Sequence, residues 1–162
     1  MKVRKAVPRD IPDIRAVTLD AYSIYEEDSL IPWYNEKNIG SVKDYNDRYF
    51  SDNSCISFIL EENNKIIGFA ICSKSISNVP RLNPLYLPNK KLLYLFDIGI
   101  RRTTQRKGYG TFLLEYIIKW AKRNKFQNLI LNTQTNSIAH KWYKKSGFIE
   151  ITSEVFLNKK ID

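Results

Sequence analysis

The chain has 162 residues, of which 43% are hydrophobic and 13% aromatic, and this composition excludes a disordered protein. Its net charge of +9, from 26 Lys and Arg against 17 Asp and Glu, favours an anionic ligand or surface. The N-terminal residues MKVRKAVPRD lack the apolar core of a signal peptide, and no stretch reaches the roughly eighteen apolar residues of a membrane span. We therefore expect one cytoplasmic domain over residues 1–162, with no membrane partner.

The cysteines and the histidine exclude two further classes of protein. Cys55 and Cys72 are too few for a disulfide framework. A zinc site needs more ligands than these two residues and the one histidine of the chain, His140, can supply. We therefore expect neither a disulfide-stabilised fold nor a bound metal.

The first third of the chain predicts one strand and two helices. Val3–Val7 is expected as a strand. Ser41 and Asp44 have the spacing of a capping box for a second helix that runs to Phe50. Asp10 is placed to cap the first helix, whose apolar residues share one face: Ile11, Ile14, Val17, Ala21 and Tyr25.

A β-hairpin is expected where two apolar runs, Cys55–Glu61 and Lys65–Cys72, flank Asn63-Asn64. Asparagine tolerates the left-handed backbone geometry of a tight turn. Uninterrupted pairing from this turn places Leu60 opposite Ile67, Phe58 opposite Phe69, and Cys55 opposite Cys72. A disulfide is geometrically allowed in that register, although a reducing cytoplasm favours free thiols.

The centre of the chain predicts a strand, a loop and a helix after a long connection at residues 74–91, a feature that is often functional. Leu92–Ile100 is an unbroken apolar run typical of a buried strand. In the loop Gln105–Gly110, backbone N–H groups, a helix N-terminus and two cationic side chains suit a diphosphate, and its glycines allow close approach. The helix that follows has apolar residues on one face: Leu113, Leu114, Ile117, Ile118 and Ala121.

The C-terminal part predicts a strand, a helix and one or two terminal strands. Leu129–Thr133 is expected as a strand, and Ser137–Lys145 as a helix that Gly147 ends. Phe148–Leu157 supplies the terminal strands. The complete order, β-α-α-β-β-β-α-β-α-β, predicts an α/β (α+β) fold with a mixed sheet and helices on both faces.

Two segments together resemble the acetyl-CoA site of a known family. Gln105–Gly110 has the pattern Q-x-x-G-x-G at a strand-to-helix junction, and Asn136–Phe148 follows with N-x-x-A-x-x-W-Y-x-x-x-G-F. Their order and spacing are similar to those of the GNAT superfamily of N-acetyltransferases. The resemblance covers nearly the whole chain. It implies a mostly antiparallel central sheet, acetyl-CoA as co-substrate, and direct acetyl transfer to a primary amine in a ternary complex.

The resemblance also implies roles for individual residues. The backbone of Ile98, Gly99 and Ile100 would pair with pantetheine, although Gly99 also fits as a small residue beneath a packed aromatic ring. Tyr143 would protonate the departing thiolate, for which a phenol with a pKa near 10 is competent. Asn136 would hydrogen-bond the CoA arm, cap its helix, or do both. The pyrophosphate would lie on the backbone of Gln105, Arg106, Lys107, Gly108, Tyr109 and Gly110.

At the general base the sequence departs from the family pattern. Family members often carry a carboxylate at the position of Phe96 or near Asn132, and neither residue here is acidic. Asp97 adjoins the first position, but strand alternation would turn its side chain to the other face. The alternatives are a chain of water molecules, or the acidic loop that flanks the acceptor groove in the family and would suit a cationic acceptor: Glu26, Glu27 and Asp28.

The sequence leaves the acceptor and the function class open. Within the acetyltransferase hypothesis, the amine is a small polyamine-like or antibiotic-like molecule, or a protein N-terminus. Two other hypotheses are an acyl-CoA-binding regulator without transfer activity and a basic nucleic-acid-binding module, for which no motif is visible. A homodimer is also left open.

Overall fold

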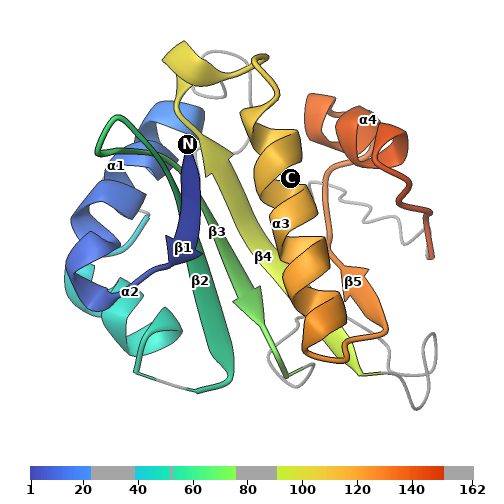
Figure 1. The fold of residues 1–162 in the computed structure, drawn as a ribbon, viewed down its shortest axis with the longest axis horizontal. Helices are drawn as coiled ribbons and strands as arrows, with labels where there is room; N and C mark the ends of the chain where they lie inside the picture. Colours follow the sequence, from blue (N-terminus) through green and yellow to red (C-terminus); the bar gives the residue numbers. More distant parts are fainter. Residues whose placement is uncertain (23–38, 52, 76–90, 152–162) are drawn as a thin grey trace, which may run out of the picture. The chain divides into compact units, whose positions relative to one another are not determined.

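The computed structural model describes residues 1–22, 39–51, 53–75 and 91–151, which fall in two compact units, Met1–Leu131 and Asn132–Asp162. The second unit contains α4 (Ile138–Lys145). Most of the connection expected at residues 74–91 lies outside the described residues. Figure 1 shows the elements of the first unit: β1 (Lys2–Lys5), η1 (Pro8–Asp10), α1 (Ile11–Tyr22), α2 (Val42–Tyr49), β2 (Cys55–Glu62), β3 (Lys65–Ser73), β4 (Leu92–Ile100), η5 (Arg102–Thr104), α3 (Tyr109–Arg123) and β5 (Asn128–Ile130).

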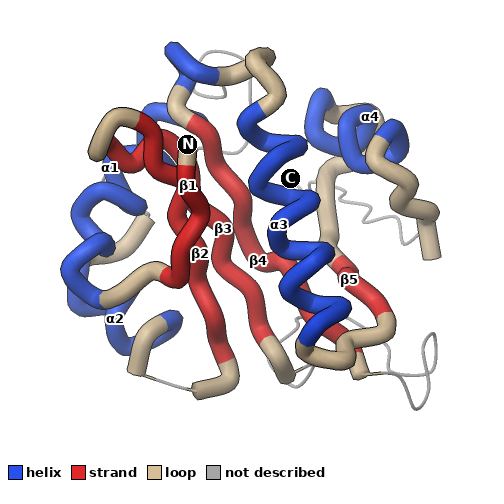
Figure 2. The backbone as a smooth tube through the Cα atoms, viewed as in Figure 1, coloured by secondary structure: helices blue, strands red, loops and turns tan. Residues whose placement is uncertain are grey.

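Within the described residues, the first unit is built on a five-stranded sheet in the order β1-β2-β3-β4-β5 (Figure 2). Neighbouring strands are antiparallel except β4 and β5, which are parallel. On one face, α1 and α2 share a core cluster with β2 and β3: Ile11, Ile14, Val17, Tyr45, Ile59, Phe69 and Ile71. On the other face, Phe58 of β2 contacts the rings of Tyr116 and Trp120 on α3. The mixed, mostly antiparallel sheet with helices on both faces is therefore confirmed.

Most expected elements are present, with changes at their ends. The central strand has the expected bounds, whereas β1 ends at Lys5, because the η1 turn begins at Pro8. β5 ends at Ile130, three residues before the expected end. Residues 148–151 are not in a strand, and the rest of the expected terminal strands lies outside the described residues. No helix in the described ranges is long and apolar enough to span a membrane.

Within the described residues the helices bury the expected faces, with one exception in α3; Tyr25, expected on the buried face of the first helix, lies outside the described residues. The buried residues of α3 are Leu113, Leu114, Ile117 and Ala121, and Ile118 is 41% exposed. Ile118 therefore lies beside the buried face of the helix.

The helix caps are partly as expected. Ser41 Oγ accepts the N–H of Asp44, and the Asp44 carboxylate accepts the N–H of Ser41, which confirms the capping box of α2. Asp10 does not cap α1; it ends η1, and its carboxylate accepts the N–H of Val7 at 2.8 Å. In α4 the cap is Ser137, which accepts the N–H of His140, so the expectation that Asn136 caps the helix is wrong.

The β2–β3 hairpin turns at Asn63-Asn64, both with positive φ, but the expected register is wrong. A β-bulge makes Ile67 an extra residue in β3, so that Leu60 pairs with Gly68, Phe58 with Ala70, and Cys55 with Ser73. The carbonyl of Ile67 accepts the N–H of Arg101, which satisfies the bulged backbone. Cys55 and Cys72 are therefore not opposite each other, and both are free thiols.

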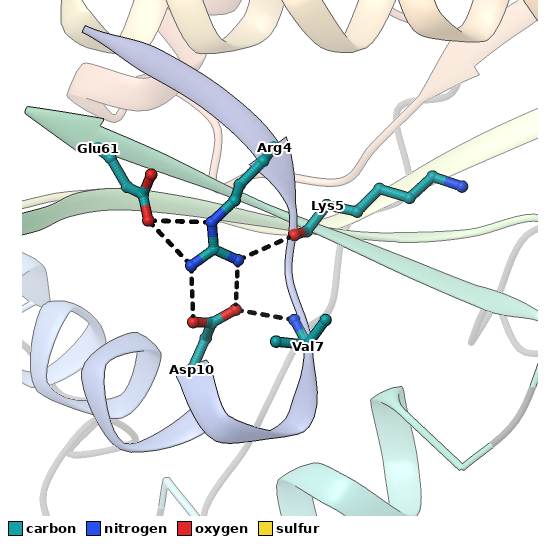
Figure 3. A network of polar contacts seen from close by, with 5 residues as sticks. All are labelled: Arg4, Lys5, Val7, Asp10 and Glu61. Atoms are coloured by element: carbon teal, nitrogen blue, oxygen red, sulfur yellow. Dashed lines mark hydrogen bonds and ion pairs between the residues drawn. The ribbon is translucent and has the colours of Figure 1, made fainter. Parts of the chain in front are cut away.

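A charged network joins β1, η1 and β2 (Figure 3). The guanidinium of Arg4 donates to both carboxylate oxygens of Asp10, at 2.8 and 2.9 Å, and its Nε donates to Glu61 at 3.0 Å. Asp10 is 4% exposed, and its carboxylate also accepts a hydrogen bond from the N–H of Val7. Because a buried carboxylate with three donors is well satisfied, this network fixes the first strand and the first turn to the sheet.

We expect Asp10→Asn to lower the free energy of unfolding by about 2 kcal/mol at pH 7, because a charge-assisted pair is lost in a buried place. Arg4 holds the pKa of Asp10 below its usual value. The pair therefore stabilises the fold above about pH 4, and its contribution disappears as the pH falls through the pKa of folded Asp10. Urea denaturation of both proteins at several pH values measures the difference. Asp47→Asn, at an exposed position of α2, is the matched control, and equal losses in the two variants would contradict the expectation.

Candidate active site

The central strand β4 is irregular where the sequence departs from the family pattern. Asp97 pairs with Ile71 of β3, but the register then shifts, which makes Phe96 an extra residue in β4. Such a bulge lets two successive side chains lie on one face. Ile71, which is opposite Asp97, belongs to the core cluster on the α1 and α2 face of the sheet, and Phe96 packs against the same cluster. The expectation that Asp97 faces away from Phe96 is therefore wrong.

Asp97 is partly buried and has two hydrogen-bond donors. The hydroxyl of Tyr22, the last residue of α1, donates to Oδ1 at 2.5 Å, and the N–H of Ile98 donates to the same carboxylate. Burial raises the pKa of Asp97 to about 6, because the low-dielectric surroundings disfavour the charged form more than the two donors favour it. Asp97 is thus ionised at neutral pH, and its pKa lies near the value that an effective general base needs.

One edge of β4 is unpaired over its second half in the described part of the chain. β5 pairs only with Leu92, Leu93 and Tyr94, and beyond this point no strand in the described part of the chain pairs with that edge. The other edge of Ile98–Ile100 pairs with β3. A Cβ at Gly99 would lie 2.5 Å from Phe69, so Gly99 is indeed the small residue beneath a packed aromatic. The unpaired edge is consistent with the expected pairing of β4 with pantetheine.

The loop Gln105–Gly110 connects the end of β4 to α3. The side-chain amide of Gln105 donates to the carbonyl of Ile100 at 2.9 Å and fixes the loop to the strand. Arg106 and Gly108 have φ of 61° and 84°, so the backbone of this loop turns through the left-handed region twice before α3 begins.

The N-terminus of α3 is open toward this loop. No side chain caps it, and the first hydrogen bond of the helix runs from Phe112 to Gly108. The N–H groups of Tyr109 and Gly110 therefore have no acceptor within the helix. A Cβ at Gly108 would meet no atom within 4 Å. N–H groups at a helix N-terminus beside open space suit a diphosphate.

The side chain of Tyr109 is engaged elsewhere. Its hydroxyl lies 2.7 and 2.8 Å from the two carboxylate oxygens of Glu62, at the end of β2, and this hydrogen bond raises the pKa of Tyr109. The pair fastens the start of α3 to the turn of the hairpin. Because its hydroxyl is bonded to Glu62, Tyr109 offers its backbone N–H, and not its hydroxyl, to a ligand.

The second unit holds Tyr143 and Asn136. Tyr143 is 7% exposed, and its ring lies 4.7 Å from that of Trp142 and 5.4 Å from that of Phe148. Asn136 has φ of 64°, and its N–H donates to Nδ1 of His140 at 3.0 Å. Nε2 of His140 lies 3.0 Å from Glu150 Oε1 and donates to it, because Nδ1 is the acceptor. His140 thus orders the start of α4.

The structure brings together residues that the sequence did not connect. Tyr22 was not among the expected site residues, because its hydrogen bond to Asp97 joins positions far apart in the chain. Glu26, Glu27 and Asp28 lie outside the described residues. Among the residues that are described, no cluster of three or more His, Cys, Asp or Glu side chains could hold a metal ion.

Comparison with known proteins identifies the family. The model of the acetyltransferase (GNAT) family matches residues 19–148. The chain is 31% identical over 131 residues to a ribosomal protein bS18-alanine N-acetyltransferase of Haemophilus influenzae, with 80% of this chain and 73% of that protein covered. It is 27% identical over 128 residues to the probable N-acetyltransferase san of Drosophila melanogaster, with 73% of this chain and 61% of that protein covered.

Solved structures share the fold at low identity. A mutant of the BH1408 protein from Bacillus halodurans has a TM-score of 0.81 and 15% identity, with 99% of this chain and all of that chain covered. The aminoglycoside N-acetyltransferase AAC(6')-Iy, in complex with CoA, has a TM-score of 0.66 and 16% identity, with 99% and 100% covered. The chain therefore belongs to the acetyltransferase (GNAT) family of enzymes, which confirms the resemblance carried by its two sequence motifs.

Proposed function

We propose that residues 1–162 form one acetyltransferase domain that transfers the acetyl group of acetyl-CoA to a primary amine in a ternary complex. The observation that carries this proposal is Asp97: an ionised carboxylate, with a pKa of about 6, on the strand that leads into the open loop before α3. A base for the amine and a binding loop for the donor thus lie on one continuous segment of chain.

The residues around α3 and β4 suit the donor. The N–H groups from Gln105 to Gly110 would hold the pyrophosphate, with Arg106 and Lys107 adding positive charge. The backbone of Ile98–Ile100, at the unpaired edge of β4, would hold pantetheine. When bound, acetyl-CoA supplies an acetyl group activated as a thioester.

We expect Gly108→Val to lower the affinity for acetyl-CoA by about tenfold or more, since it places a side chain in the space where the ligand approaches. It also strains a residue with φ of +84° by about 1–2 kcal/mol. Gly40→Val is the control for backbone strain, because Gly40 has φ of +81° and lies outside both sequence motifs. Calorimetric titration with acetyl-CoA should show weak binding in the first variant alone. Unchanged affinity in a folded Gly108→Val protein would rule out this loop as the donor site.

Two residues of the chain would move protons. Asp97 would accept the proton of the amine as it attacks, and the hydroxyl of Tyr143 would deliver a proton to the departing sulfur. Asn136 would hold the CoA arm through its side chain, since its backbone N–H is bonded to His140.

We further infer that the acceptor is the α-amine of a peptide or protein. An α-amino group has a pKa near 8, and an alkylamine such as lysine one near 10.4. Proton transfer to Asp97, whose pKa is about 6, is therefore unfavourable by about two pK units for an α-amine and about four for an alkylamine. The relative from Haemophilus influenzae is named as an alanine N-acetyltransferase, which supports the same acceptor class.

Release of CoA with a panel of amines tests this proposal. The panel contains a peptide with a free N-terminal alanine, the same peptide with a blocked N-terminus and one lysine, a polyamine and an aminoglycoside. We expect the free N-terminal peptide to give the highest kcat/KM. A higher kcat/KM with the polyamine or the aminoglycoside would show that the acceptor is not an α-amine. Binding of acetyl-CoA without transfer to any amine would favour the hypothesis of an acyl-CoA-binding regulator.

A further inference from the structure

A hydrogen bond ties the end of α1 to the proposed base. Tyr22 is the last residue of α1, and its hydroxyl donates to Oδ1 of Asp97, 75 positions later in the chain. We propose that Tyr22 is a positioning residue for acetyl transfer, because its hydroxyl fixes the Asp97 carboxylate on the bulge of β4 as an ionised proton acceptor. This inference rests on the proposed function of Asp97 as the general base.

The carboxylate lies on an aromatic face of the first unit. The ring of Phe96 is 4.8 Å from that of Tyr94 and 6.1 Å from that of Tyr49, and Tyr45 contacts Tyr49 at 5.5 Å. Aromatic rings provide packing but little solvation for a negative charge. The ionised form of Asp97 therefore depends on the few polar groups that reach it.

Those groups are identifiable element by element. From α2, Tyr45 and Tyr49 face Asp97, but the hydroxyl of Tyr45 is bonded to Thr18 and that of Tyr49 to Arg48. Arg48 lies over the Tyr49 ring, 5.8 Å from its centroid. From α1, Arg15 acts on Tyr45, and from β3 the facing residues, Phe69 and Ile71, are apolar. Tyr22 is thus the side-chain donor that offsets the burial of the carboxylate within the described residues.

Removal of the Tyr22 hydroxyl should change the pKa of Asp97 in a defined direction. Tyr22→Phe keeps the ring and its packing but removes the hydroxyl, so the charged form of Asp97 loses a partner and its pKa rises above the value of about 6. We expect the rise to be about one pH unit. Tyr45→Phe is the matched control: the same change in the same aromatic cluster, at a hydroxyl that bonds Thr18 instead of Asp97. It should leave the titration of Asp97 nearly unchanged.

The first measurement needs no ligand and no turnover. Carbon-13 NMR of the aspartate carboxyl groups follows the titration of Asp97 directly, with its signal assigned by its absence in Asp97→Asn. We expect a higher midpoint in Tyr22→Phe than in the wild type and in Tyr45→Phe. Coincident midpoints in Tyr22→Phe and wild type would overturn the inference.

The second measurement is the pH profile of kcat/KM for acetyl transfer. In Tyr22→Phe the acidic limb should move upward by the same amount as the NMR midpoint, while activity at high pH is retained, since Asp97 is ionised there in both proteins. If Tyr22 had only a structural role, Tyr22→Phe would lower activity at every pH, and this result would overturn the inference. A shift of the NMR midpoint without a shift of the pH profile would also overturn it. Failure of the proposed function itself appears in the wild type, as no transfer to any amine, and the inference then falls with it. Failure of the inference alone appears in an active enzyme with an unshifted profile.

Discussion

Tyr143→Phe is expected to lower kcat by about 10²-fold and to leave the affinity for acetyl-CoA nearly unchanged. The substitution keeps the ring, which is buried and packed against Trp142 and Phe148, and removes only the hydroxyl that would protonate the departing thiolate. The loss therefore belongs to the chemical step. Steady-state kinetics with a saturating peptide, together with calorimetric titration of acetyl-CoA, separates kcat from donor binding.

Tyr116→Phe is the matched control for this effect. Its ring packs against Phe58 in the core of the first unit, so the variant also loses one hydroxyl from a packed tyrosine. We expect it to keep its kcat. An acetyl donor whose thiol has a lower pKa should reduce the deficit of Tyr143→Phe, because a better leaving group needs less protonation. An equal loss in both tyrosine variants would assign the effect to packing and remove Tyr143 from proton transfer.

Asp97→Asn is expected to lower kcat/KM by about 10²-fold at pH 7 and to change the shape of the pH profile. With an α-amine of pKa near 8, log kcat/KM should fall with slope one below pH 8, because the free amine is lost. In the wild type the slope should increase to two below about pH 6, where Asp97 also becomes protonated. In Asp97→Asn the slope should stay at one, since the second titrating group is absent.

The same variant is expected to be more stable, which separates lost activity from lost fold. Because the pKa of folded Asp97 is raised to about 6, its ionised form destabilises the native state increasingly as the pH rises from about 4 to 6. Asp97→Asn should therefore raise the free energy of unfolding at pH 7 by up to about 3 kcal/mol. Full activity at all pH values in this stable variant would transfer the base role to water or to the Glu26–Asp28 loop.

Local patterns were enough to locate the main elements of the fold. Leu92–Ile100 was predicted to the residue because an unbroken apolar run bounded by polar residues is the signal of a buried strand. The capping box at Ser41 and the turn at Asn63-Asn64 depend on contacts within a few residues, so they too were visible in the sequence. The prediction of the β2–β3 register failed at the bulge beside Leu60, because a contact between distant residues decides the pairing there.

The sequence by itself determined the family, the order of the helices and strands as far as α4, and the loop Gln105–Gly110, because periodicity, turn residues and motif spacing are encoded along the chain. Only the tertiary structure decided which side of the sheet Asp97 faces and what surrounds it. The bulge at Phe96 inserts one residue into a strand, and this change carries no local signal yet reverses the face of a neighbouring side chain. The hydrogen bonds from Tyr22 to Asp97 and from Tyr109 to Glu62 join residues 75 and 47 positions apart, and such pairs exist only once the sheet and its helices have packed.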